Sequence, residues 1–179
     1  MWQCLIGAAC MRFHTACMDT RHSPQAHRAR FRGRPPEPGR LYLITTFTVR
    51  RQPLFADWRC AWAACASLRV SARQHDAELL CWVLMPDHWH GLVRLGGNAD
   101  LPALMHVIKR ASARAANLAR GHGGAIWEPG YWARALRQDE DAAIAARYVV
   151  QQPVRARLAR RAAEYPYWDA LWLDRGRAA

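Results

Sequence analysis

Two histidines separated by one residue, His88 and His90, are spaced to bind a metal ion together. They begin an apolar segment that directly follows Met85-Pro86-Asp87. In a β-strand, residues i and i+2 point to the same face, so the two imidazoles are expected to project side by side while Trp89 packs behind them. Such a pair provides two ligands of a metal site. The simpler alternative is a pair of core or solvated histidines, because the chain has eight histidines and a short motif is weak evidence.

A phenol and a carboxamide are expected on one side of a helix spanning residues 139–152. Acidic residues occupy its first turn, alanines fill its middle and Pro153 follows its end, as expected for a helix. Tyr148 and Gln152 are four residues apart and are therefore neighbours on the helix surface. Taken alone, this pattern favours a simpler interpretation, in which Tyr148 packs in the core and Gln152 is a solvated terminal residue.

Together with several other motifs, these residues resemble the REP-associated tyrosine transposases, a branch of the single-tyrosine HUH transposases of insertion sequences. The resemblance runs from about residue 41 to residue 172, and it depends on the order and spacing of the motifs rather than on any one of them. The motifs are LYLITTF (41–47), RRQPLF (50–55), WVLMPDHWHGLV (82–93), WEPGYW (127–132), ALR (135–137), RYVVQQPV (147–154) and EYPYWDALW (164–172).

The resemblance implies a role for each candidate residue. His88 and His90 would be metal ligands, Tyr148 the nucleophile, and Gln152 the third ligand. The REP-associated branch usually has asparagine at this last position, whereas related insertion-sequence enzymes have glutamine. Two imidazoles and an amide oxygen form an open set of nitrogen and oxygen ligands that suits Mg²⁺ or Mn²⁺. A structural zinc site, in contrast, is closed and usually rich in thiolates.

The activity implied by the resemblance is metal-dependent, site-specific cleavage and strand transfer of single-stranded DNA through a 5′-phosphotyrosine intermediate, with REP-type palindromic hairpins as substrate. A domesticated, non-catalytic DNA-binding protein is the alternative. The intact His88, His90 and Tyr148 disfavour it, and the glutamine at position 152 weakly favours it. An RNA-binding ferredoxin-like module ranks last, since histidines occupy part of the sheet face that such a module needs for aromatic residues. The resemblance favours a monomer, with a homodimer possible.

Composition agrees with a nucleic-acid partner. The net charge is +12, and strongly basic domains commonly bind polyanions. The chain has 25 arginines and one lysine, which partly reflects coding bias, so solvated arginines are expected beside functional ones. Aromatic residues near the loop at 127–132 could stack on unpaired bases. The predicted DNA contacts are Arg50, Arg51, Lys109, Arg110, Arg114, Trp127, Arg137 and Arg147.

The expected fold is of the α+β class, with a ferredoxin-like antiparallel sheet and helices packed on one face, as in HUH endonucleases. The predicted elements are strands at 41–49, 78–85 and 88–95, helices at 55–73 and 101–120, an extended segment at 131–136 and the tyrosine helix. We expect Trp58 and Trp62, both on the first helix, to be buried in the protein core. One catalytic domain is predicted for residues 41–175.

Residues 1–40 are rich in proline, arginine and glycine and are predicted to be a disordered basic arm, or to result from an over-extended start of translation. The first ten residues lack the basic n-region of a secretory signal and are too short to span a bilayer. Six cysteines without a C-x-x-C pair indicate reduced thiols rather than a disulfide framework. A cytoplasmic location is therefore expected.

Overall fold

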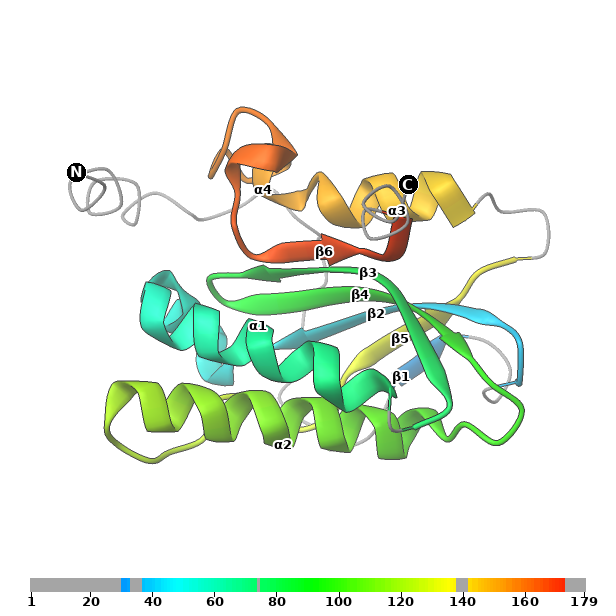
Figure 1. Ribbon diagram of the computed structural model, residues 1–179, viewed down its shortest axis with the longest axis horizontal. Coiled ribbons are helices and arrows are strands. Elements are labelled where there is room, and N and C mark those ends of the chain that lie inside the picture. Colours follow the sequence, from blue (N-terminus) through cyan, green and yellow to red (C-terminus); the bar gives the residue numbers. More distant parts are fainter. Residues whose placement is uncertain (1–29, 33–36, 74, 138–141, 173–179) are drawn as a thin grey trace.

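The described part of the computed structural model, residues 30–32, 37–73, 75–137 and 142–172, is a six-stranded sheet with helices on both sides (Figure 1). The predicted α+β class is confirmed. In chain order, the elements are β1 (Arg30–Arg32), β2 (Leu41–Phe47), the 3-10 helices η1 (Val49–Arg51) and η2 (Leu54–Ala56), α1 (Trp58–Arg73), β3 (Ala77–Met85), β4 (His88–Leu95), α2 (Leu101–Arg120), β5 (Trp132–Ala135), α3 (Ala142–Val150), α4 (Gln152–Arg155), η3 (Ala162–Glu164) and β6 (Trp168–Ala170).

The strands lie in the order β1-β5-β2-β4-β3-β6. Neighbouring strands are antiparallel, as predicted, except that β1 pairs with β5 in parallel. Strand β1 belongs to the segment predicted to be a disordered arm, so the sheet begins earlier in the chain than the predicted boundary at residue 41. The rest of that arm, residues 1–29 and 33–36, lies outside the described residues.

Both faces of the central strands are apolar, and both are covered. One face carries Trp82 and Leu84 from β3 with Trp89 from β4, packed against α1 and α2. The other carries Val83 and Met85, packed against α3. Figure 1 shows α1 and α2 on one side of the sheet and α3 on the opposite side. The expected packing on one face therefore holds for α1 and α2, whereas α3 covers the second face because β3 is hydrophobic on both sides.

Helix α2 begins and ends as its sequence predicts. The Asp100 carboxylate accepts a hydrogen bond from the Ala103 amide at 3.2 Å and thereby caps the first turn. Gly121, at φ 72°, adopts the left-handed conformation that commonly ends helices. This capping fixes both ends of the longest helix in the described residues.

The tryptophans of α1 were predicted to lie in the core, and this is wrong. Trp58 is 57% exposed and Trp62 is 65% exposed. The buried residues of α1 include Ala61, Ala64 and Leu68, which follow the 3–4 residue spacing of one helix face. The two indoles lie on a different side of the helix.

The tyrosine helix is shorter than predicted. Helix α3 ends at Val150, and the chain turns at Gln151 into the short helix α4. Pro153 lies in the first turn of α4. A proline is tolerated there because backbone amides of the first turn have no acceptor within the helix. The acidic residues expected in the first turn of the tyrosine helix, 139–141, lie outside the described residues. Within the described helices, none is long and apolar enough to cross a membrane.

Candidate active site

The β3–β4 hairpin positions the two histidines, as predicted. Its connection is Pro86–Asp87, and Met85 lies opposite His88 in the register. Because side chains alternate along a strand, His88 and His90 point to the α3 face of the sheet. Their ring centroids are 4.7 Å apart and the rings are nearly perpendicular, at 84°. The two imidazoles therefore lie side by side at the start of β4.

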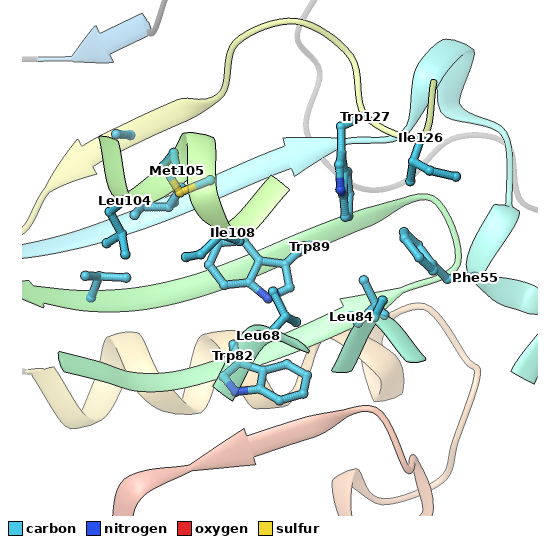
Figure 2. Packing of buried hydrophobic residues seen from close by; sticks show 14 of the residues in the cluster. Phe55, Leu68, Trp82, Leu84, Trp89, Leu104, Met105, Ile108, Ile126 and Trp127 are labelled. Atoms are coloured by element: carbon cyan, nitrogen blue, oxygen red, sulfur yellow. The ribbon is translucent and has the colours of Figure 1, made fainter. Parts of the chain in front are cut away.

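Trp89 points the other way and anchors this end of β4 in the core. Its side chain is fully buried, and Figure 2 shows its indole in the middle of the labelled core residues. The indole folds back over Gly91, where a Cβ atom would lie 2.2 Å from Trp89 Cη2. The absence of a side chain at position 91 thus makes room for the indole of Trp89. This requirement for glycine was not predicted from the sequence.

His90 is buried and neutral. Its Nδ1 lies 2.7 Å from Oγ1 of Thr45, which is the residue opposite His90 on β2. Burial lowers the pKa of His90 well below its usual 6.5, and the charges of His88 and Arg51 lower it further. A neutral imidazole is the form that binds a metal. With Nδ1 turned to Thr45, Nε2 is the nitrogen available to a ligand.

His88 is held by the residue that precedes it. Its Nδ1 lies 2.5 Å from Oδ1 of Asp87. Burial alone would raise the pKa of Asp87, but its hydrogen bond with His88 and the charges of His88 and Arg51 keep it below its usual range. An ionised carboxylate only accepts hydrogen bonds, so Nδ1 of His88 carries the proton. Nε2 of a neutral His88 then has a free lone pair.

Helix α3 brings Tyr148 to the histidines. Ala145, Ala146 and Val149 pack against the sheet, and small alanines allow the helix to approach it closely. The Tyr148 ring is half-buried, and its centroid lies 6.5 Å from that of His90. The Tyr148 side chain therefore faces the histidine pair rather than packing entirely in the core.

Gln152 is buried beside the same tyrosine. Its side chain is 1% exposed, so the solvated alternative is wrong. The amide Nε2 donates to the Tyr148 carbonyl at 3.1 Å, and Oε1 is the atom that could bind a metal. Among the described residues, no group of three His, Cys, Asp or Glu could hold a metal ion. A metal bound by the two histidines thus needs an amide, a substrate atom or water to complete its shell.

A tight turn at residues 48–52 lies next to the histidines. Arg50 and Arg51 have φ of 53° and 55°, a left-handed conformation that non-glycine residues rarely adopt. Thr48 Oγ1 lies 2.7 Å from the Gln52 carbonyl oxygen and 3.0 Å from that of Asp87. The Arg50 amide donates to Glu128 Oε1 at 3.2 Å. The turn is therefore tied to the β3–β4 connection.

The other predicted DNA contacts are divided between the two faces of the sheet. Arg147 is exposed on α3 beside Tyr148, and Arg137 is exposed just after β5. Arg110 and Arg114 are exposed on α2, which covers the opposite face. The structure does not bring these last two to the histidines.

Lys109 and Trp127, also predicted to contact DNA, hold a loop instead. The Lys109 ammonium donates to the carbonyls of Glu128 and Gly130 at 2.6 and 2.7 Å. Burial lowers the pKa of Lys109 to about 8, although the charge of Glu128 opposes this shift. Trp127 is 8% exposed and its Nε1 donates to Ser112 Oγ at 3.0 Å. Base stacking by Trp127 is therefore contradicted by its burial in the core.

Three further residues of the site were not predicted. Asp87 precedes His88 directly, and a carboxylate next to a candidate ligand was a usable signal. Thr45 was visible only through the β2–β4 register. Arg155 follows Tyr148 by seven residues, and its guanidinium carbon lies 4.8 Å from the Tyr148 ring centroid.

The chain is similar to known transposases in sequence and in fold. A REP-associated tyrosine transposase of Escherichia coli (strain K12) is 26% identical over 96 residues, which cover 53% of this chain and 55% of that protein. The chain thus matches about half the length of this relative. A solved structure of a REP-associated tyrosine transposase bound to a REP hairpin superposes with a TM-score of 0.60 at 22% identity, covering 78% of this chain and 81% of the other. This likeness confirms the HUH-type fold. The model of the family described as "Transposase IS200 like" matches residues 40–152, a segment that contains both histidines, Tyr148 and Gln152. Because this match covers more than half of the chain, the protein belongs to the family of IS200-like transposases.

Proposed function

We propose that this protein cleaves and rejoins single-stranded DNA through a covalent bond to Tyr148, with REP-type hairpins as its substrate and Mg²⁺ or Mn²⁺ as its cofactor. The observation that supports this most directly is the approach of the Tyr148 ring to the neutral, buried His90. Family membership and the hairpin-bound structural relative support the choice of DNA.

Tyr148 supplies the nucleophile in this reaction. Its phenolic oxygen attacks the phosphorus, the bond from phosphorus to the 3′ oxygen breaks, and a 5′-phosphotyrosine forms. The phenol loses its proton and the departing 3′ oxygen gains one. Attack of a 3′-hydroxyl on the phosphotyrosine then reverses the step and rejoins the strand. Because each step exchanges one phosphate ester for another, the sequence needs no external energy source.

The residues around Tyr148 fit a divalent cation. When bound, the cation would withdraw charge from the non-bridging phosphate oxygens. Nε2 of His88, Nε2 of His90 and Oε1 of Gln152 are the atoms that would hold it. This neutral set of nitrogen and oxygen donors leaves room for phosphate oxygens, as Mg²⁺ or Mn²⁺ require. A group of three ionisable ligands is absent from the described residues, which agrees with an amide as the third ligand.

Arginines would bind the DNA backbone around this site. Arg155 lies against the Tyr148 ring, so its charge is placed to attract the phosphate that Tyr148 attacks. Arg50 and Arg147 are also exposed. Arg147 directly precedes Tyr148 and Arg50 lies in the turn next to the histidines, so both are further candidates for contacts with the DNA backbone. Contacts of this kind release counterions, so binding should weaken steeply with salt.

The test is a covalent trapping experiment. Purified protein is incubated with single-stranded hairpin oligonucleotides from repeats flanking the gene, with Mg²⁺ or Mn²⁺, and run on a denaturing SDS gel. We expect a DNA-linked protein band that EDTA and Tyr148→Phe both abolish, since phenylalanine lacks the attacking oxygen. Tyr165→Phe is a matched control, because the Tyr165 side chain is buried and its hydroxyl donates to the Leu84 carbonyl at 2.7 Å, so this phenol is not presented to DNA.

Two outcomes would contradict the proposal. A covalent band in Tyr148→Phe would mean that another residue is the nucleophile. Salt-sensitive hairpin binding without any covalent band would indicate the alternative, a non-catalytic DNA-binding protein with the same fold. The expected monomeric state and cytoplasmic location stay predictions, and sedimentation of the protein with and without hairpin would test the former.

A further inference from the structure

Arg51 and Asp87 form a chain of contacts that ends on His88. Arg51 Nε lies 3.3 Å from Asp87 Oδ2, and Asp87 Oδ1 lies 2.5 Å from His88 Nδ1. The guanidinium of Arg51 also stacks on the Phe47 ring at 4.0 Å, and that ring lies 5.8 Å from the His88 ring. One arginine thus contacts both groups that border His88.

The neighbouring arginine lacks these contacts. Arg50 shares the left-handed backbone conformation of Arg51, and its backbone amide is bonded to Glu128. Within the described residues, however, its side chain makes no ion pair or ring contact. The two arginines are adjacent, equally charged and similar in backbone conformation, but one guanidinium faces the protein and the other faces solvent.

We infer that Asp87 and Arg51 are positioning residues for the metal ligand His88: Asp87 holds Nδ1 so that Nε2 faces the cation, and Arg51 holds Asp87. This inference rests on the proposed function, because it assumes a cation at the histidine pair. Partners of this kind fix the tautomer and orientation of a ligating histidine. Arg51 would then act on the metal site without touching the metal, and would do more than bind phosphate.

Simple electrostatics predicts the opposite effect for Arg51. A guanidinium near a cation repels it, and it also neutralises part of the Asp87 charge. If charge alone mattered, removal of the guanidinium would tighten metal binding. If Arg51 holds Asp87 in place, removal weakens metal binding. The sign of the change therefore separates the two explanations.

The experiment measures Mn²⁺ binding to the full chain without DNA, by electron paramagnetic resonance of free Mn²⁺, at pH 8. We expect Asp87→Asn to raise the Mn²⁺ dissociation constant by about 10- to 100-fold, as for other partners of ligating histidines. Arg51→Gln should raise it by roughly two- to fivefold, the effect of a half-exposed ion pair. Arg50→Gln is the matched control and should leave the constant unchanged. In the Asp87→Asn background, Arg51→Gln should add little, since the contact it supports is already lost.

A second measurement reads the His88 ring directly and needs no metal. In metal-free protein, long-range ¹H–¹⁵N spectra should show His88 with its proton on Nδ1, and Asp87→Asn should shift the population toward the Nε2–H tautomer. Glu78→Gln controls for loss of a carboxylate, because Glu78 pairs with exposed Arg94 at 2.6 Å and should leave the spectrum as in the parent protein.

The outcomes distinguish this inference from the proposed function. If the parent protein binds no Mn²⁺, or if His88→Ala binds it equally well, the metal site itself is wrong, and the tautomer measurement alone decides the role of Asp87. If His88→Ala loses binding but Asp87→Asn matches the parent in both measurements, the inference is wrong and the metal site stands. Tighter or unchanged binding in Arg51→Gln would overturn the role of Arg51.

Discussion

The two faces of the sheet differ in how they use the same strands. On the α1 and α2 face, β4 contributes Trp89 to a large apolar cluster under two long helices. On the α3 face, it contributes His88 and His90 under a helix of nine residues. Strand alternation therefore places each candidate ligand next to a residue that anchors the backbone on the opposite side. Trp89 thus anchors β4 on the α1 and α2 face, whereas the α3 face carries the candidate ligands.

A substitution of Trp89 should show the largest effect on stability. Trp89→Ala removes a fully buried indole and should lower the free energy of unfolding by about 3–5 kcal/mol, measured by urea denaturation of metal-free protein. His88→Ala, one residue away but partly exposed, should cost about 1 kcal/mol or less. Similar costs for the two variants would show that the faces do not divide stability and chemistry in this way.

A substitution of Lys109 should lower the free energy of unfolding through the α1 and α2 side of the protein, without removing a charge that contacts DNA. Lys109→Met leaves the carbonyls of Glu128 and Gly130 without their donor and should cost about 1–3 kcal/mol in the same denaturation experiment. Arg114→Gln, on the same helix and exposed, should stay within about 0.5 kcal/mol of the parent. The salt dependence of hairpin binding should not change in Lys109→Met. If its slope falls by about one, Lys109 contacts a phosphate after all.

Acid should destabilise the protein through the α3 face. The native pKa of His90 lies well below 6.5, whereas in the unfolded chain it is near 6.5. The unfolded state therefore binds the proton more readily, so this contribution to stability is complete above pH 6.5 and is lost as the pH falls toward the native pKa. The slope due to His90 should reach at most about 1.4 kcal/mol per pH unit. Denaturation midpoints from pH 7.5 to 5 in metal-free parent and His90→Gln would measure the difference, and parallel curves would contradict the buried, neutral state of His90.

Local sequence signals were sufficient for most of the fold. Alternating and helical hydrophobic patterns identified β2, β3, β4, α1, α2 and β5 within a few residues, and the predicted ends of α2 match the structure. The same patterns failed where tertiary contacts decide. Trp58 and Trp62 have the apolar character of core residues but lie on a side of α1 that no described element covers. Gln152 has the character of a surface residue but is buried.

The candidate site was predicted in part for a similar reason. His88 and His90 form a local i, i+2 pair, so a strand is enough to place them together. Tyr148 and Gln152 were connected to them by family resemblance and not by any local pattern. Asp87, Thr45 and Arg155 contribute through a turn, a strand register and a contact between α4 and α3, which residue types alone do not specify.

An α+β domain with a histidine pair on one strand and a tyrosine on a later helix can be read from residue order, because these features depend on short-range periodicity and on motifs with fixed spacing. Three other properties required the folded chain: which nitrogen of each imidazole faces a ligand, which arginine of an adjacent pair supports a histidine, and which aromatic residues are buried. Those properties depend on contacts between residues distant in sequence, such as Thr45 with His90 and Arg51 with Asp87, and such contacts form only when the sheet and its helices have packed.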